Sequence, residues 1–398
     1  MWRELAPIGR DATSGGYRRH AWTGADTDCR AWFAAQAAAR GLVYETDRNG
    51  NQWAWLGDPA AGDAVVTGSH LDSVPDGGAY DGPLGVVSAF AALDELRRRG
   101  AEFTRPFAVV NFGDEEGARF GLACVGSRLT AGQLTREAAY ALTDADGITL
   151  PRAMEHAGLD PDAIGPDPER LARIGAFVEL HIEQGRALDR TGDRIGLASA
   201  IWPHGRWRFD FTGEANHAGT TRIADRRDPM LGYAATVLAA RAAAERTGAV
   251  ATFGKVAVEP NGVNAVPSLV RGWLDSRAAD PETLAAVVAA VEEAARERAA
   301  RDGVDVTVVR ESFTPVVEFG HALRDELDRL LGGSVPVLGT GAGHDAGILS
   351  GSVPTAMLFV RNPTGVSHSP AESAAEDDCV AGVLALADVV EGLACETR

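Results

Sequence analysis

The chain has 398 residues, which is too long for one ordinary domain, so we expect two. Its formal net charge of −18 lacks the basic footprint that nucleic-acid binding requires. We therefore expect no nucleic-acid partner. No apolar run reaches the roughly 18 residues of a membrane span, and the N-terminus lacks the pattern of a secretory signal, so we expect no membrane association. Four scattered cysteines without a Cys-x-x-Cys pattern favour a cytoplasmic protein with neither a disulfide framework nor a thiolate metal site.

The first half of the chain is predicted to alternate buried strands with helices. A helix is expected over 83–99, because its apolar residues recur at helical spacing and Gly100 follows. Apolar strands are expected at 64–67, 107–112 and 174–182. This alternation predicts an α/β sheet with helices on its faces, and ligands of such sheets bind beyond the carboxyl ends of the strands.

The middle of the chain has a different pattern. Residues 206–211 alternate strictly between apolar and charged, which predicts a strand with one buried face on which Trp207, Phe209 and Phe211 pack. The expected order continues with a helix at 229–246, strands at 250–258 and 268–275, a helix at 281–300 and a strand at 304–310. This is the β-α-β-β-α-β order of a ferredoxin-like fold.

We therefore expect an inserted domain over 203–312, flanked by the two parts of a catalytic domain, 1–202 and 313–398. The second part of the catalytic domain is predicted to contain a strand at 354–360 and a last helix from about 376.

Histidines and acids gather in the turns that follow the predicted strands. His70, His181, His344 and His368 lie in such turns, and His217 lies in the segment 215–219. Asp72 stands two residues from His70, where it can accept a hydrogen bond from the second ring nitrogen of a metal-bound histidine. Asp81 follows on a glycine-rich loop. The run Asp114-Glu115-Glu116 places three like charges at a strand end, where they repel unless a cation neutralises them.

This donor set predicts a metal centre. Imidazole and carboxylate ligands without thiolates suit Zn²⁺ or Mn²⁺, and also Co²⁺. Three histidines with at least two carboxylates exceed the needs of one tetrahedral ion, and they suit two divalent ions that share a carboxylate and a water. A further carboxylate left free would act as a general base. This is the chemistry of amide hydrolysis.

Seven segments together resemble the dinuclear-zinc aminoacylase/carboxypeptidase superfamily, in its amidase/hydantoinase/carbamoylase branch. That branch contains N-carbamoyl-L-amino acid hydrolases, β-ureidopropionases and allantoate amidohydrolases. The resemblance implies a mixed-sheet α/β metallohydrolase domain with an inserted ferredoxin-like α+β domain that serves as a lid and forms a homodimer. The matching segments are 68–82, 114–121, 179–185, 215–221, 260–267, 341–346 and 367–372.

The resemblance also implies roles for the metal-site residues. His70 and His181 would bind one metal ion, Glu116 and His368 would bind the other, and Asp81 would bridge the two ions. Glu115 would be the general base and later the proton donor. Asp72 would orient His70.

For the substrate, the resemblance implies contacts from both domains. Gln184 would face the substrate, His217 would stabilise the oxyanion, and Asn264 and Arg277 would bind a substrate carboxylate. His217 and Asn264 could serve the site of their own chain or that of a dimer partner. A surface salt bridge is the alternative for Arg277.

His344 is counted among the substrate contacts, with simple support of its loop as an equal alternative. One residue departs from the family pattern: Arg222 stands where the family usually has proline.

The function expected from this resemblance is cleavage of the ureido C–N bond of a small carboxylate, with release of ammonia and carbon dioxide. Allantoate amidohydrolase leads, and N-carbamoyl-L-amino acid hydrolase or β-ureidopropionase is the alternative. An aminoacylase or peptidase is less favoured because of the segment 181–185. A catalytically silent metal-binding scaffold is less favoured because Glu115 is present.

Overall fold

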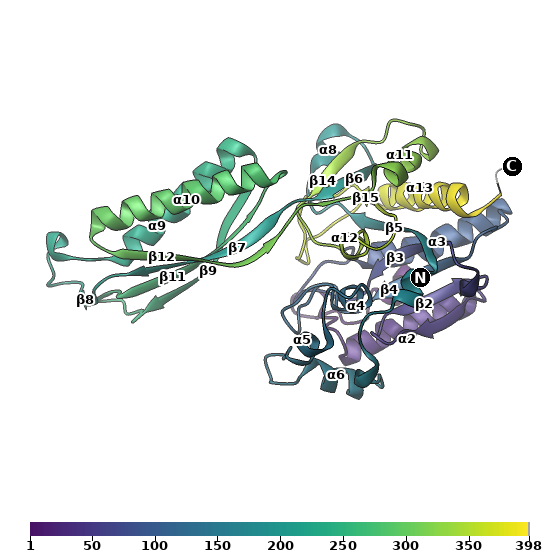
Figure 1. Ribbon diagram of the computed structural model, residues 1–398, viewed down its shortest axis with the longest axis horizontal. Helices are drawn as coiled ribbons and strands as arrows, with labels where there is room; N and C mark the ends of the chain where they lie inside the picture. Colours follow the sequence, from purple (N-terminus) through teal and green to yellow (C-terminus); the bar gives the residue numbers. More distant parts are fainter. Residues whose placement is uncertain (397–398) are drawn as a thin grey trace. The chain divides into compact units, whose positions relative to one another are not determined.

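A computed structural model describes residues 1–396, and the chain forms two compact units (Figure 1). The second unit is Ala200–Val317, and the first unit comprises Met1–Ser199 and the chain from Glu318 onward. The sequence-based boundaries were 203 and 312. Within 1–396, no helix combines the length and the apolar character needed to cross a membrane.

The first unit is built on a mixed sheet of nine strands. Its order is β1-β2-β4-β3-β5-β15-β6-β13, and β14 pairs with β6. The strands are β1 (Val43–Thr46), β2 (Gln52–Leu56), β3 (Ala64–His70), β4 (Phe107–Phe112), β5 (Ile174–Ile182), β6 (Ile195–Ile201), β13 (Val317–Glu318), β14 (Val337–Thr340) and β15 (Thr355–Val360). The central strands β4, β3, β5 and β15 are parallel, so their carboxyl ends meet at one edge of the sheet.

Two long helices cover one face of this sheet and form the main core. α3 (Pro83–Arg99) and α13 (Glu376–Ala394) pack against each other, and Phe90 and Leu386 are fully buried between helices and strands. α3 begins with proline in its first turn and ends where Gly100 adopts a left-handed conformation (φ 70°). The other helices of the unit are α1 (Trp2–Leu5), α2 (Gly24–Ala39), α4 (Val125–Thr130), α5 (Arg136–Tyr140), α6 (Leu150–His156), α7 (Pro168–Leu171), α8 (Ala187–Thr191), α11 (His321–Leu330) and α12 (Asp345–Leu349).

The second unit has the expected β-α-β-β-α-β order. Its antiparallel sheet has the strand order β12-β7-β11-β9, and two helices pack side by side on one face (Figure 1). The side chains of Trp207, Phe209 and Phe211 are buried in the core beneath these helices, as predicted. The elements are β7 (His204–Thr212), α9 (Pro229–Thr247), β9 (Val250–Glu259), β11 (Leu269–Arg277), α10 (Pro281–Asp302) and β12 (Asp305–Thr314). A two-stranded ribbon, β8 (Asn216–His217) with β10 (Ala265–Val266), completes the unit.

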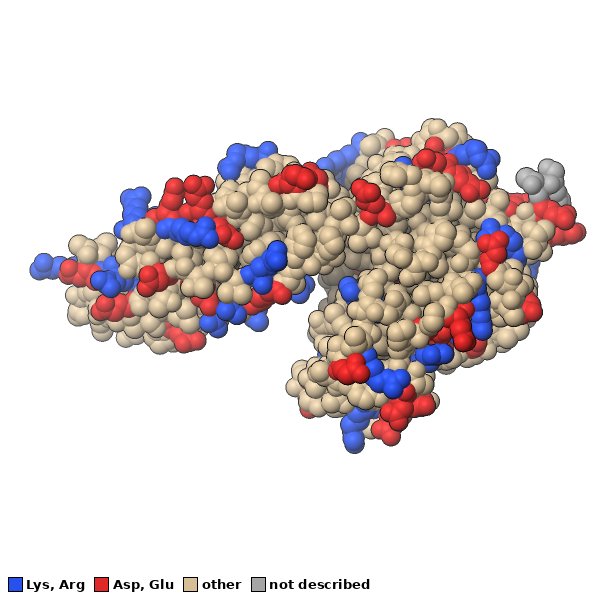
Figure 2. Space-filling model, in the orientation of Figure 1, with Lys and Arg blue, Asp and Glu red and all other residues tan. Residues whose placement is uncertain are grey.

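The surface carries charges of both signs. Figure 2 shows acidic and basic side chains interspersed over the visible face, with no continuous basic patch on that face. Charges of both signs are therefore mixed on the visible face, which is typical of a well-solvated protein.

Candidate metal centre and catalytic residues

The predicted ligands of the first unit meet at the carboxyl ends of the parallel strands. His70 is the last residue of β3, His181 lies one residue before the end of β5, and Glu115 and Glu116 follow β4. These strands are neighbours in the sheet, so their terminal side chains converge. The segment with Asp81 leads into α3 and lies over the same edge.

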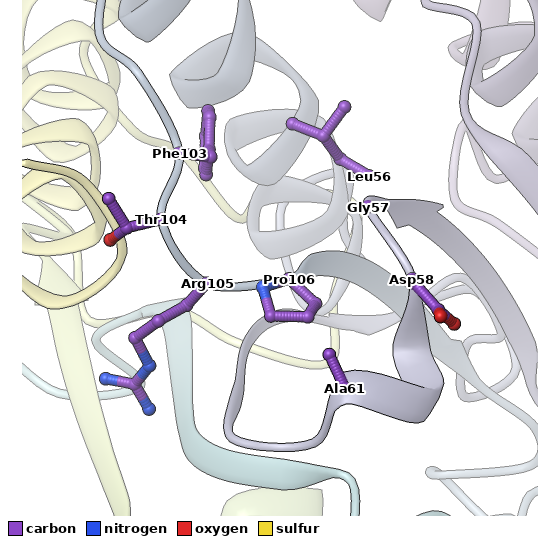
Figure 3. A pocket seen from close by; sticks show the side chains of 8 residues that line it. All are labelled: Leu56, Gly57, Asp58, Ala61, Phe103, Thr104, Arg105 and Pro106. Atoms are coloured by element: carbon purple, nitrogen blue, oxygen red, sulfur yellow. The ribbon is translucent and has the colours of Figure 1, made fainter.

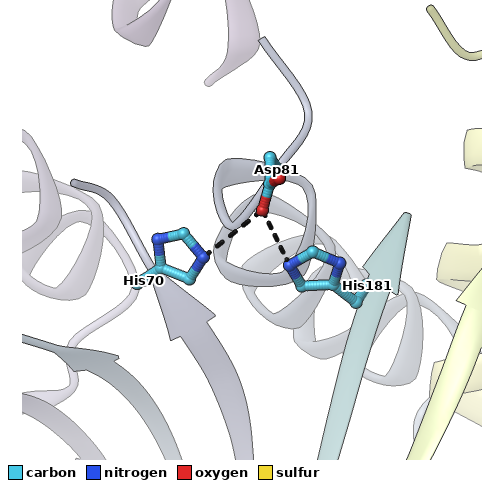
Figure 4. A group of neighbouring side chains, drawn as sticks. All are labelled: His70, Asp81 and His181. Carbon is cyan, nitrogen blue, oxygen red and sulfur yellow. Dashed lines mark ion pairs between the residues drawn. The ribbon is translucent and has the colours of Figure 1, made fainter. Parts of the chain in front are cut away.

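Asp81 stands at the centre of the cluster, and its two carboxylate oxygens face different partners. Oδ1 lies 3.6 Å from Nε2 of His70 and 3.2 Å from Nε2 of His181 (Figure 4). Oδ2 lies 3.4 Å from Nε2 of His368, and that same Nε2 lies 3.5 Å from Oε2 of Glu116. The described residues thus contain three donor groups. Two of them, His70/Asp81/His181 and Asp81/Glu116/His368, share the Asp81 carboxylate, and the third is Glu179/His181/His344.

Both buried histidines present the same ring nitrogen to Asp81. Nδ1 of His181 lies 2.9 Å from the carbonyl oxygen of Ile182, and Nδ1 of His70 lies 3.1 Å from the carbonyl oxygen of Asp72. A protonated Nδ1 bonded to a carbonyl leaves the lone pair of Nε2 as an acceptor, which is the tautomer that binds a metal ion. In His181 this Nε2 accepts the backbone N–H of Gly82 (3.2 Å). Nε2 of His70 is buried without a hydrogen-bond partner among the described residues, so the donor set fits a cation at this point.

Asp72 lies beside His70 and also contacts the main chain of Glu115 and Glu116. Its carboxylate is 3.5 Å from Nδ1 of His70, so the closer contact to that ring is the main-chain carbonyl. The carboxylate oxygens instead accept the backbone N–H groups of Glu115 (3.1 Å) and Glu116 (3.0 Å). Asp72 therefore fixes the main chain that carries both the expected base and one expected ligand.

Glu115 is buried, and among the described residues no Lys or Arg forms an ion pair with it. One of its oxygens lies 3.7 Å from Nε2 of His70, and the other accepts a weak hydrogen bond from the thiol of Cys124 (3.4 Å). Burial raises the pKa of Glu115 well above its ordinary value, against the opposing effect of His70. A carboxylate with raised basicity and few partners suits proton transfer.

The pKa values of the acids and histidines in the cluster are shifted by burial and by their neighbours, as is typical of groups that release protons when a metal ion binds. Burial opposes ionisation of Asp81, but His181, His368 and His70 hold its pKa well below the ordinary value. Burial and the charge of Asp81 raise the pKa of Glu116 to about 7. The hydrogen bond to Asp81 raises the pKa of His368 to about 8. A divalent ion would replace the protons that now balance these charges.

Gln184 and His344 both border the cluster. Nε2 of Gln184 donates to Oδ2 of Asp81 (2.8 Å) and to Ser367 (3.2 Å), whereas its carbonyl oxygen is buried without a partner among the described residues. His344 is 3% exposed, and its ring packs on that of His181 with centroids 4.5 Å apart. Its Nε2 lacks a described hydrogen-bond partner, so both residues retain one polar atom for a ligand.

The second unit holds the remaining predicted substrate contacts. Nδ1 of His217 accepts the backbone N–H groups of Gly219 (3.0 Å) and Thr220 (3.2 Å), so the neutral ring carries its proton on Nε2. The carbonyl of Asn264 accepts the N–H of Ala218, which joins the two predicted contacts in one ribbon. Arg277, by contrast, ends β11 and donates to both carboxylate oxygens of Asp275 (2.8 and 3.1 Å).

Glu179 was not assigned a role from the sequence. It is fully buried on β5, accepts a hydrogen bond from Ser69 on β3 (2.7 Å), and accepts the N–H of Ala346 at the start of α12 (2.9 Å). It thereby connects the segments that carry His70, His181 and His344. Its place inside the segment 179–185 was the available signal, but the sequence does not show which segments such a carboxylate will join.

A cavity elsewhere on the first unit is unconnected with these residues. It has a volume of about 490 Å³ and is lined by Leu56, Phe103 and Pro106 among others (Figure 3). Phe103 and Pro106 precede β4, so the cavity lies at the amino ends of the parallel strands. The ligand cluster lies at their carboxyl ends, which are the usual binding edge of such sheets.

Fold and site together define an α/β protein with a candidate centre for two metal ions. A profile of the family described as "Peptidase family M20/M25/M40" matches residues 66–392, and the chain belongs to this family. It is 36% identical to the N-carbamoyl-L-amino acid amidohydrolase of Geobacillus stearothermophilus, over 99% of this chain and 98% of that protein. It is 33% identical to the allantoate amidohydrolase of Escherichia coli strain K12, over 98% and 96% of the two chains.

The solved structures agree with this assignment. A crystal structure of an amidase of the hydantoinase/carbamoylase family from Burkholderia multivorans superposes with a TM-score of 0.88. It is 32% identical to this chain and covers all of it, with 97% of the amidase matched. The predicted fold class and the resemblance are therefore confirmed, and the protein is a hydrolase that acts on C–N amide bonds.

Proposed function

We propose that the chain hydrolyses the terminal ureido C–N bond of a small carboxylate, with the help of two divalent cations. His70 and His181 would bind one ion, Glu116 and His368 would bind the other, and Asp81 would contact both. The observation that carries this proposal is that the two oxygens of Asp81 have different neighbours. Oδ1 faces His70 and His181, whereas Oδ2 faces His368. The donor set suits Zn²⁺ or Mn²⁺ first, and Co²⁺ next.

The residues of the chain would divide the proton transfers between them. When bound, the two ions would polarise the ureido carbonyl and acidify the attacking water. Glu115 would take the proton from that water and return it to the departing nitrogen. The Glu115 side chain suits this role because it is buried, its pKa is raised, and no Lys or Arg among the described residues donates a hydrogen bond to it. The Nε2–H of His217 would donate to the oxyanion. Ammonia, carbon dioxide and an amine would be the products.

The relatives support two substrates. Allantoate is the substrate expected from the sequence, and the name of the Escherichia coli relative contains it. N-carbamoyl-L-amino acids are the second candidate, because the relative of that name has the higher identity, 36% against 33%. Both substrates present a ureido group and a carboxylate. Oδ2 of Asp81 already accepts the amide of Gln184, which would leave the Gln184 carbonyl oxygen for the ureido N–H groups.

The geometry of the second unit supports a homodimer in which two chains complete each site. His217 lies in β8, which follows the end of β7. Thr212, the last residue of β7, pairs with Leu269 at the start of β11. Arg277 stands eight residues further along β11, roughly 27 Å away at about 3.4 Å per residue. A small ureido carboxylate cannot span this distance. His217 and Arg277 of one chain would therefore serve different substrate molecules, and a partner chain would supply the missing contact.

Two experiments test the proposal. Ammonia release from allantoate, N-carbamoyl-L-amino acids and dipeptides, with and without a chelator, would identify the substrate. Absence of chelator-sensitive turnover of every ureido compound would refute the proposed function. For the dimer, inactive Glu115→Gln and His217→Ala chains should regain activity when mixed and refolded together, because one of the two sites in a mixed dimer contains both native residues. Mixtures that stay inactive would rule out a His217 that serves the site of the partner chain, and a chain that sediments only as a monomer would rule out shared sites.

A further inference from the structure

Glu372 is a buried acid that contacts a loop 291 residues earlier in the chain. It is 6% exposed, and its Oε2 accepts the backbone N–H groups of Tyr80 (2.7 Å) and Asp81 (3.1 Å). A carboxylate oxygen that accepts two consecutive amides holds the main chain at that point in one orientation. The orientation of the Asp81 side chain depends on this backbone, so Glu372 acts on the shared carboxylate without touching it.

The approach of Glu372 to this loop is close. A Cβ atom at Gly78 would overlap the Glu372 carboxylate, so only glycine allows the carboxylate to reach the amides of Tyr80 and Asp81. This explains one glycine of the Gly77-Gly78 pair by contact with a residue far away in sequence, rather than by a turn. The loop thus has space for the Glu372 carboxylate only because position 78 carries no side chain.

The same segment of chain also carries His368. Ser367 donates to Oδ2 of Asp81 (3.0 Å) and lies 3.5 Å from Oε1 of Glu372, so the segment 367–372 contacts the Asp81 loop at two points. Between these contacts His368 adopts a left-handed backbone conformation (φ 54°), which is costly for a residue with a Cβ atom. Contacts on both sides of His368 hold it in this conformation.

We infer that Glu372 is a positioning residue of the metal centre, which fixes Asp81 and His368 relative to each other by binding the amides of Tyr80 and Asp81. This inference rests on the proposed function, since it requires that Asp81 and His368 bind metal ions. Glu372 adds a third acid beside Asp81 and Glu116, and such crowding of anions is unfavourable unless the amides and the bound cations compensate for it. A residue that served only to stabilise the fold would not need this location.

The test measures the binding of Zn²⁺ and of Mn²⁺ to the full-length protein, by competition with a chromophoric chelator. Glu372→Ala removes the acceptor and should weaken binding by about 10- to 100-fold, the usual effect of losing a group that orients metal ligands. Glu372→Gln keeps one acceptor oxygen and should stay within about threefold of the wild type. Hydrogen exchange in the metal-free protein should show faster exchange of the Tyr80 and Asp81 amides in Glu372→Ala alone.

A matched control separates positioning from general stabilisation. Asp167 is a similarly buried acid (5% exposed) that accepts the backbone N–H of Arg170, and among the described residues it makes no hydrogen bond or ion pair with the ligand cluster. Asp167→Ala should lower thermal stability while metal affinity stays unchanged. Metal affinity of Glu372→Ala equal to that of the wild type, or lowered no more than in Asp167→Ala, would overturn the inference.

Two further results keep the test decisive. If Glu372→Ala does not fold, Glu372→Asp replaces it, because its carboxylate is one methylene too short to reach the two amides. It should then bind metal more weakly than Glu372→Gln, and equal affinities of Glu372→Asp and the wild type would overturn the inference. A wild-type protein that binds neither ion would instead refute the proposed function, before any variant is compared.

Discussion

Replacement of Glu115 by glutamine separates proton transfer from metal binding. Glutamine has the shape of glutamate, and Glu115 makes only a weak hydrogen bond with Cys124 and a 3.7 Å approach to His70. The variant should therefore keep its metal content. Loss of the base should lower kcat about 100- to 10,000-fold, or about 2.7 to 5.4 kcal/mol in activation free energy.

Stability should change in the opposite direction. Burial raises the pKa of Glu115 well above its ordinary value, which means that ionised Glu115 is disfavoured in the folded protein relative to the unfolded chain. The neutral amide avoids this cost, so the metal-free variant should unfold at the same or a higher temperature at neutral pH.

The assay combines single-turnover kinetics with metal analysis and calorimetry. Glu116→Gln is the control, because its carboxylate faces Nε2 of His368 in the second donor group. It should lose metal affinity as well as activity. Full activity of Glu115→Gln, or loss of its bound metal in parallel with Glu116→Gln, would refute the assignment of Glu115 as the base.

Three other outcomes follow from the geometry and the charges. The pKa of Glu116 is raised to about 7 and that of His368 to about 8, and both groups must release a proton to bind a cation. Metal affinity should thus fall as the pH drops from about 8 to about 6. The accompanying proton release can be measured by titration calorimetry in buffers of different ionisation enthalpy. A metal affinity that does not change with pH would contradict the ligand set. Removal of the ions with a chelator should abolish activity and lower the unfolding temperature. An ion at 1,000 times its Kd contributes about 4 kcal/mol to the free energy of unfolding. Calorimetric scans that the chelator leaves unchanged would argue against tight metal sites. Asp72→Ala leaves the buried amide of Glu115 without its acceptor and should cost about 1 to 3 kcal/mol in the free energy of unfolding, measured by denaturant titration against Asp167→Ala.

Much of the fold could be predicted from the sequence because its signals are local. The helix at 83–99 and the strands at 107–112 and 174–182 have the predicted bounds, since apolar spacing, a terminal glycine and β-branched runs act within a few residues. The strand at 64–67 extends to His70 in the structure, because the added residues pair with β4, and Gly68 also pairs with β5, although their side chains gave no strand signal. Strands β1, β2, β6 and β14 were not predicted; β2, β6 and β14 pair with partners distant in sequence, and β1 joins the sheet edge through a local hairpin with β2.

The sequence by itself determined which residue types gather after which strands and the membership of an amidohydrolase family, and it predicted the donor set and the role of Glu115. Its motifs carry this information because side chains that bind one ion must be of fixed chemical type. Only the tertiary structure decided how the oxygens are shared. It directs Oδ1 and Oδ2 of Asp81 to different histidines, turns the Asp72 carboxylate to the amides of Glu115 and Glu116, and brings Glu372 to the Asp81 loop. These contacts join segments that are up to 291 residues apart, and their direction depends on packing around the whole sheet, which no local pattern records.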